Sequence, residues 1–208
     1  MIGGEITWRC LTSGPNSGKF IFRIAAYREC GGILWNPQTI TLSSNSPVAS
    51  IPCIKVGSPT NVAPTCFNGQ PSCTGATAAT GIIEQHIFES APVLINGTPP
   101  AAGWVFKWDT ECCRPGGMTN MLNSGSQSFY LRAVMKPFSP GGVGTAALNT
   151  YPCYDSSPSF AEAPLSVLCA GYTYTYSHNA ADQDLDELQY SLTAPLGGSG
   201  SGTALAPQ

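Results

Sequence analysis

Cysteine content constrains the fold of this chain more than any other feature. Nine cysteines occur in 208 residues, at Cys10, Cys30, Cys53, Cys66, Cys73, Cys112, Cys113, Cys153 and Cys169. A cytosolic protein rarely carries so many unless it binds metal, and zinc ribbons need paired C-x-x-C spacings that none of these gaps has. The sequence therefore predicts disulfides formed in an oxidising compartment. Because the number is odd, at least one thiol is free or pairs with another chain if the others pair.

Composition excludes several functional classes. Only 10% of residues are charged, the formal net charge is −3 and the pI is about 5.2. Such a surface has no cationic field to recruit phosphates, which argues against nucleic-acid binding. Hydrophobic residues make up 42% of the chain, enough to form a core. The sequence contains no run of about 18 apolar residues of the kind that predicts a membrane-spanning helix.

Apolar alternation of the β type dominates the chain. The strands expected from it lie at residues 5–11, 19–28, 38–42, 82–88, 104–108, 128–135, 171–177 and 188–192. Gly, Pro, Asn and Ser clusters separate these runs, and no window has the 3.6-residue stripe of an amphipathic helix. We therefore expect an all-β fold, a disulfide-stabilised β-sandwich of the Ig-like or cadherin-like kind. Residues 43–80 are predicted as one long loop that its cysteines hold together.

A composition shift near Asp155 predicts two parts. Residues 1–154 hold most of the expected strands and form an N-terminal β-sandwich domain. Residues 155–208 carry two or three strands and a Gly/Ser-rich tail from residue 197, too few strands to close a sandwich. We expect this second part to be the start of an incomplete Ig-like or cadherin-like module.

Vicinal cysteines suggest one set of disulfide candidates. Cys112 and Cys113 are adjacent, and neighbouring cysteines seldom bond to each other because the ring strains the disulfide geometry. On a strand their side chains point to opposite faces, so they suit two separate bridges. Cys10 and Cys30 are plausible partners for them, since each lies at the end of an expected strand.

Two further pairings follow from sequence distance. Cys66 and Cys73 are close enough to bond to each other, and Cys153 and Cys169 flank the expected boundary and are placed to clamp it. The connectivity stays open, because sequence alone does not fix it.

An acidic turn is the clearest candidate for a metal site. Asp182, Asp184 and Asp186 alternate along one loop ahead of an expected strand. Calcium takes six to eight oxygen ligands, and such a loop supplies some of them. The EF-hand pattern is absent, because its glycine and distal glutamate are missing. Calcium binding and a merely solvated turn both remain open, and no other cofactor is expected.

The sequence contains no recognised catalytic motif. His86 and His178 are the two histidines, and neither lies in a recognised motif such as G-x-S-x-G or H-E-x-x-H. His86 alternates with apolar neighbours and is predicted to be a strand-surface side chain. We therefore expect a protein that is not an enzyme.

Aromatic residues suggest a sugar-binding alternative. Tyr172, Tyr174 and Tyr176 share one strand face by the two-residue period. Such a stripe either stacks on sugar rings or covers a half-buried sheet face. Tryptophans that lie exposed on the surface would also support sugar binding. The chain has four tryptophans: Trp8, Trp35, Trp104 and Trp108.

Several segments, in order along most of the chain, resemble a known family. They lie at residues 3–10, 26–30, 112–114, 129–131, 156–160, 168–171, 182–186 and 190–192. Together they resemble the N-terminal region of large Bacteroidetes cell-surface adhesin-like proteins. That family is associated with gliding motility and type 9 secretion, and it carries repeated Ig-like, PKD or cadherin-like modules. Its acidic turn usually contains Asp-Gly-Asp, whereas this chain has Leu185 at the glycine position.

The resemblance implies a structural or adhesive role on the bacterial cell surface, and no defined reaction. We expect an extracellular module whose partners are identical subunits or further modules of the same surface protein. The unfinished sheet after residue 155 suggests a filament formed by strand addition. The alternative is a carbohydrate-binding module of a secreted protein, with glycans as partners.

Overall fold

The computed structural model describes residues 1–32, 34–62, 73, 82–110, 114, 123–137, 155–161, 173, 175, 177, 179–197 and 203–204. Within this part the regular elements are β-strands and one short 3-10 turn, η1 (Ser124–Ser126). No helix among these residues is long and apolar enough to cross a membrane. The prediction of an all-β fold is confirmed.

Seven strands form the main sheet and four short ones form two small sheets. The main strands are β1 (Gly3–Cys10), β2 (Phe20–Glu29), β3 (Thr39–Ser44), β4 (Ser50–Asn61), β5 (Ile83–Ser90), β6 (Trp104–Thr110) and β7 (Phe129–Met135). The short strands are β8 (Ser159–Phe160), which pairs with β9 (Ala180–Ala181), and β10 (Leu196–Gly197), which pairs with β11 (Thr203–Ala204).

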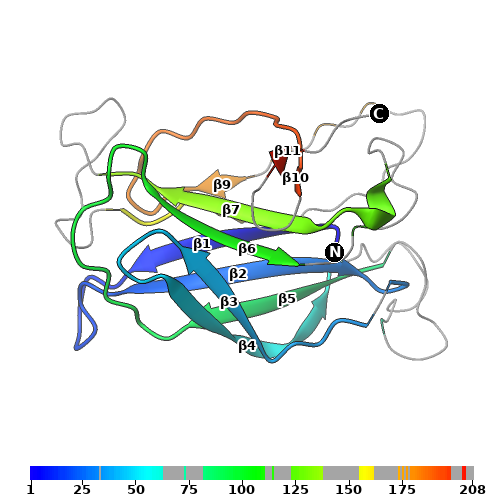
Figure 1. The fold of residues 1–208 in the computed structure, drawn as a ribbon, viewed down its shortest axis with the longest axis horizontal. Helices are drawn as coiled ribbons and strands as arrows, with labels where there is room; N and C mark the ends of the chain where they lie inside the picture. The colour runs from blue at the N-terminus through cyan, green and yellow to red at the C-terminus, as the bar shows by residue number, and fades with distance from the viewer. Residues whose placement is uncertain are drawn as a thin grey trace.

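Strand order places the seven strands in an immunoglobulin-type arrangement. The order is β1-β2-β5-β4-β3-β6-β7, and every pair is antiparallel. Four strands followed by three in this order is the Greek-key pattern of the immunoglobulin constant-type sandwich. Because β3 also pairs with β4, the two layers are joined and the sheet is barrel-like (Figure 1).

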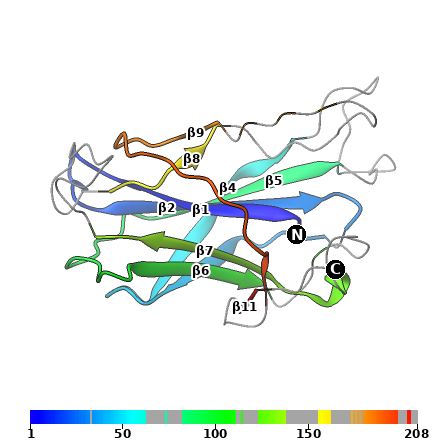
Figure 2. The same cartoon turned by 90° about the horizontal axis from the view of Figure 1, so that it is seen from above.

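The two edge strands of the sheet lie close to each other. β1 and β7 contact each other without a ladder of paired residues between them. At Gly4 an added Cβ would lie 2.9 Å from the Leu131 Cδ1 atom and 2.8 Å from the Ala25 carbonyl oxygen. Only glycine fits there, because a side chain would force these atoms apart. Figure 2 shows β8 and β9 on the β1–β2–β5–β4 side of the molecule, opposite β6 and β7.

The core lies between the layers and follows the alternation along each strand. Phe22 and Ile24 on β2 are fully buried, as are Phe88 on β5 and Phe106 on β6. The Phe22 and Phe106 rings, from opposite layers, have centroids 4.6 Å apart. Burying such side chains is the dominant favourable term in folding. The inward positions of β2 and β5 are therefore fixed by the packing of the two layers.

One expected loop is a strand. Twelve residues within 43–80 form β4. The strand contains Pro52 and Pro59, which is unusual because proline lacks the N–H of a ladder hydrogen bond. Both prolines lie at exposed positions, whereas Ile51 and Cys53 point into the core. Gly57, with φ +68°, lies in the register shift where β4 bends relative to β5.

Two other expected strands have different outcomes. Residues 188–192 belong to no strand, so that prediction is wrong. The reason is exposure: Leu192 is 101% exposed and Tyr190 60%, so neither packs against a sheet. Most of the expected strand 171–177, with Tyr172, Tyr174 and Tyr176, lies outside the described residues.

The segment that begins at Asp155 lies along the free edge of β1. The Ser157 N–H donates to the Trp8 carbonyl oxygen at 2.9 Å, and the Ser157 hydroxyl accepts from the Trp8 N–H at 2.8 Å. The Ser156 hydroxyl accepts from the Cys10 N–H at 3.3 Å. These bonds satisfy backbone groups that an edge strand leaves unpaired. The boundary between domains at 154 and 155 stays a prediction.

Candidate functional site

Three polar side chains, two of them charged, meet inside the sandwich at one end of the core. Arg28 on β2 and Glu84 on β5 face each other in register, and His86 follows two residues along β5. Arg28 NH1 donates to Glu84 Oε1 at 2.6 Å, and His86 Nε2 donates to the same oxygen at 2.8 Å. All three residues are buried, with 6%, 9% and 2% exposure in that order. We call Arg28, Glu84 and His86 the inner polar cluster.

Each charge of the inner polar cluster has a partner. Burial alone would raise the pKa of Glu84, but the hydrogen bonds from His86 and Arg28 outweigh it and lower that pKa. Burial lowers the pKa of His86. The nearby Glu84 carboxylate raises that pKa but compensates for the effect of burial only in part. His86 is therefore neutral near pH 7 and donates its Nε2 proton to Glu84. Arg28 NH2 also donates to the Gly32 carbonyl oxygen at 2.9 Å.

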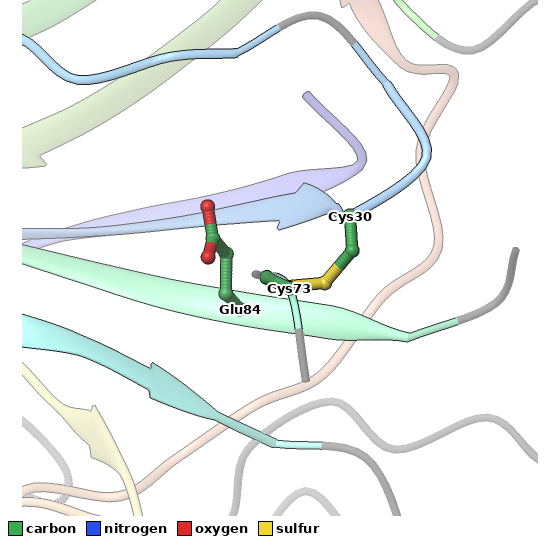
Figure 3. A group of neighbouring side chains, drawn as sticks. All are labelled: Cys30, Cys73 and Glu84. Atoms are coloured by element: carbon green, nitrogen blue, oxygen red, sulfur yellow. A yellow bond between two sulfur atoms is a disulfide. The ribbon is translucent and has the colours of Figure 1, made fainter. Parts of the chain in front are cut away.

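A disulfide closes this end of the core. Cys30, just after β2, is bonded to Cys73, with 4.9 Å between their Cα atoms and a separation of 43 positions in sequence. Figure 3 shows the bond beside the Glu84 carboxylate, and the two sulfurs and a Glu84 oxygen lie within 4.8 Å of one another. Metal ions bind thiolates, and the disulfide has none to offer. The bond therefore clamps the end of β2 to the chain segment that precedes β5.

The prediction that His86 is a surface residue is wrong. The face of β5 that carries His86 is the one that faces the core: Glu84, His86 and Phe88 point inward. Arg28 on the neighbouring strand is the physical reason, because it supplies the charge that lets Glu84 be buried. His86 Nδ1 has no hydrogen-bond partner, so no serine hydroxyl of the described chain forms a catalytic pair with it.

A second charged group contains the three predicted aspartates and one that the sequence did not indicate. Asp182 Oδ1 accepts from the Asp184 N–H at 2.8 Å and from the Asp186 N–H at 3.3 Å. Asp184 is 3% exposed, and its Oδ2 accepts from the Ser156 N–H. That bond brings Asp155 to the same place. We call these four aspartates the acidic turn.

Burial and the repulsion between carboxylates both raise pKa values in the acidic turn. Burial, followed by the charges of Asp184, Asp182 and Asp186, raises the pKa of Asp155 to about 7. Burial and the charges of Asp182 and Asp184 also raise the pKa of Asp186. Asp155 is 27 positions before Asp182 in sequence, so spacing gave no signal for it. Calcium binding here stays a prediction.

Leu185 lies at the position where the adhesin-like proteins that this chain resembles usually have glycine. The backbone of Leu185 is left-handed. Its φ is +64°, and its side chain is 69% exposed. A left-handed conformation costs a non-glycine residue about 1–2 kcal/mol, because Cβ approaches the following carbonyl. The turn therefore has a backbone conformation that favours glycine, with leucine in its place.

The tryptophans do not form a sugar-stacking surface. Trp8, Trp104 and Trp108 are 5–6% exposed, and Trp35 is half-buried. The Trp35 ring lies 5.0 Å from the His86 ring, between centroids, and 5.8 Å from Trp108. Three of the four tryptophans are buried in the core and give no support to sugar binding, which stays a prediction.

The described cysteines confirm disulfide formation but contradict one of the pairings suggested from sequence distance. Cys73 bonds to Cys30, so neither the Cys66–Cys73 pair nor a bridge from Cys30 to a vicinal cysteine is formed. Cys10 is also disulfide-bonded. Cys53 is the free cysteine of the described residues, and burial followed by the Glu89 charge raises its pKa to about 12.

The remaining cysteine candidates fall outside the described residues. They are Cys66, Cys112, Cys113, Cys153 and Cys169.

No protein family, curated protein or solved structure matches the chain. The resemblance to Bacteroidetes adhesin-like proteins therefore stays a prediction.

Proposed function

We propose that the chain is an extracellular structural or adhesive module of a bacterial surface protein, and not an enzyme. One observation carries the proposal: an immunoglobulin-type strand order is clamped by a disulfide at the end of its core. Disulfides persist in oxidising compartments, and sandwiches of this type recur in cell-surface proteins. The segments that resemble surface adhesins support the same role.

Location is tested on intact cells of the source organism. A membrane-impermeant biotin reagent should label the protein, and mass spectrometry without reduction should recover a Cys30–Cys73 linked peptide. A protein protected from the reagent, with both cysteines alkylated as free thiols, would contradict an extracellular location.

Assembly by strand addition is proposed at the edge of β1. Ser157 bonds to both the N–H and the carbonyl of Trp8, as a neighbouring strand would. The same bonds can be made to β1 of another copy, because exchange of an identical element preserves every contact. Head-to-tail exchange of this kind extends into filaments unless the rotation closes a ring.

Sedimentation at rising protein concentration tests the exchange. The unaltered chain should form oligomers, and Ser157→Pro should sediment as a monomer because it lacks the N–H and the hydroxyl that bind Trp8. Ser191→Pro, in an exposed segment without a ladder, is the matched control. A monodisperse monomer of the unaltered chain at every concentration would remove strand addition from the proposal.

A further inference from the structure

A groove runs along the outer face of the sheet, between β1 and β2 below and the β8 segment above. It consists of two adjoining hollows of about 190 and 350 Å³, which share Thr7, Arg23 and Ser159 in their walls. The larger volume falls within the range of small-molecule sites, about 300–1,000 Å³. We call this hollow the outer-face groove.

Arg23 lies at the centre of the groove and has unused donors. Its side chain is exposed on β2, and within the described chain no hydrogen bond or ion pair involves its guanidinium. Glu89 faces it in register on β5, and Glu5 lies close enough for the two charges to interact. A guanidinium offers five N–H donors in a fixed plane.

Glu5, on the strand paired with that of Arg23, supplies an unused acceptor. Its carboxylate accepts a hydrogen bond from the Phe160 backbone N–H. Its Oε2 atom is buried and has no partner. Burial raises the pKa of Glu5, which the nearby Arg23 charge opposes. A buried oxygen without a donor calls for a ligand or water that supplies one.

The charges of the groove select the class of ligand. The ionisable residues of its walls are Arg9, Arg23, Glu5 and Glu89, two of each sign. An anion would meet two carboxylates and a cation two guanidinium groups, so neither is favoured. A neutral hydroxyl both donates and accepts, and adjacent hydroxyls match the Arg23 donors and the Glu5 acceptor together. Phe160, 46% exposed, adds an apolar face at the rim, as sugar rings require.

We infer that the outer-face groove binds a neutral saccharide through adjacent hydroxyls held between Arg23 and Glu5. The site differs from the tyrosine stripe and from the tryptophans considered above. The inference rests on the proposed adhesive role, since it names what the module adheres to. Binding of free sugars to the purified protein is independent of cellular location and of assembly, so the two proposals fail separately.

Saturation-transfer NMR tests the inference with four probes at millimolar concentration. They are the methyl glycosides of glucose, galactose, mannose and N-acetylglucosamine. At least one should receive saturation from the purified chain. Arg23→Gln and Glu5→Gln should each weaken its binding about tenfold or more, the loss expected when a hydrogen bond to a charged group is removed. Arg132→Gln, at an exposed position of β7, is the matched control and should bind as the unaltered chain does.

Amide shift mapping on the unaltered protein keeps the test independent of variant folding. The bound sugar should shift the amides of Thr7, Arg23 and Ser159. Absence of saturation for all four sugars would overturn the inference, as would shifts confined to another surface or binding unaffected by Arg23→Gln. Sodium acetate or sulfate that shifts the same amides when no sugar does would also overturn it, because the groove would then be an anion site.

Discussion

The inner polar cluster and the acidic turn both bury charge, but only the first contains its own counter-charge. Arg28 and His86 converge on one oxygen of Glu84 and lower the pKa of that carboxylate. Asp155 instead meets three more aspartates, and its pKa rises to about 7. Compensated charge stabilises the fold at neutral pH, whereas uncompensated charge destabilises it until a proton or a cation arrives.

The largest effect is expected from breaking the compensated group. Arg28→Leu leaves the Glu84 carboxylate buried with only neutral His86 beside it. Removing one partner of a buried pair costs about 3–5 kcal/mol. Urea unfolding followed by tryptophan fluorescence measures the loss.

A double variant separates charge from packing in the same cluster. Arg28→Leu with Glu84→Leu removes both charges and should recover most of the loss, because apolar replacements of buried pairs are often neutral. If the double variant is as unstable as the single one, shape rather than charge holds this end of the core.

Next in size is the disulfide that clamps the same end of the core. Replacing Cys30 and Cys73 with serine opens a loop of 43 residues in the unfolded chain. The expected loss is about 2–4 kcal/mol by denaturant unfolding. Cys53→Ser, which breaks no disulfide, is a control for the chemical change, although it buries a hydroxyl. A loss no larger than that of the control would mean that the sheet alone fixes the end of β2.

Stability of the acidic turn should fall as the pH rises. The folded pKa of Asp155 is raised from 3.8 to about 7, so the folded state holds a proton that the unfolded state has released. The stability that this proton gives is present near pH 4 and is lost as pH rises to about 7. Asp155→Asn should be more stable than the unaltered chain at pH 8, by a few kcal/mol, and nearly equal to it near pH 4. Thermal unfolding across this pH range measures both.

A control variant and added calcium test whether the acidic turn causes this pH dependence. Glu187→Gln, at an exposed position next to the turn, should leave the pH profile unchanged. Calcium at millimolar concentration should raise the melting temperature above pH 7 and not near pH 4, since protons compete for the same oxygens. An equal melting temperature with and without calcium at pH 8 would make the turn a solvated acidic loop.

The smallest effect is expected from the left-handed residue of the turn. Leu185→Gly should stabilise the protein by about 1 kcal/mol, because glycine adopts φ +64° without the Cβ clash. Leu192→Gly, at an exposed residue with ordinary backbone, is the control and should not stabilise. Equal effects of the two substitutions would show that Leu185 carries no backbone strain in solution.

The sequence by itself determined the strands whose alternation is driven by burial. Six of the seven main strands were predicted close to their observed bounds. Apolar residues such as Phe22, Ile24 and Phe106 recur at every second position of a strand, because the face that packs in the core is removed from water. Disulfide formation and the clustering of Asp182 and Asp184 were likewise visible from residue types and short spacing.

Only the tertiary structure decided which face a polar residue takes and which distant residues meet. Glu84 points inward because Arg28, on a neighbouring strand, supplies its counter-charge, and His86 lies inward beside it and donates to the same oxygen. Cys73 bonds to Cys30 rather than to nearby Cys66, since the ends of β2 and β5 come together. Pairings of this kind depend on contacts across tens of residues, and local periodicity carries no information about them because it reports only the burial of each strand face.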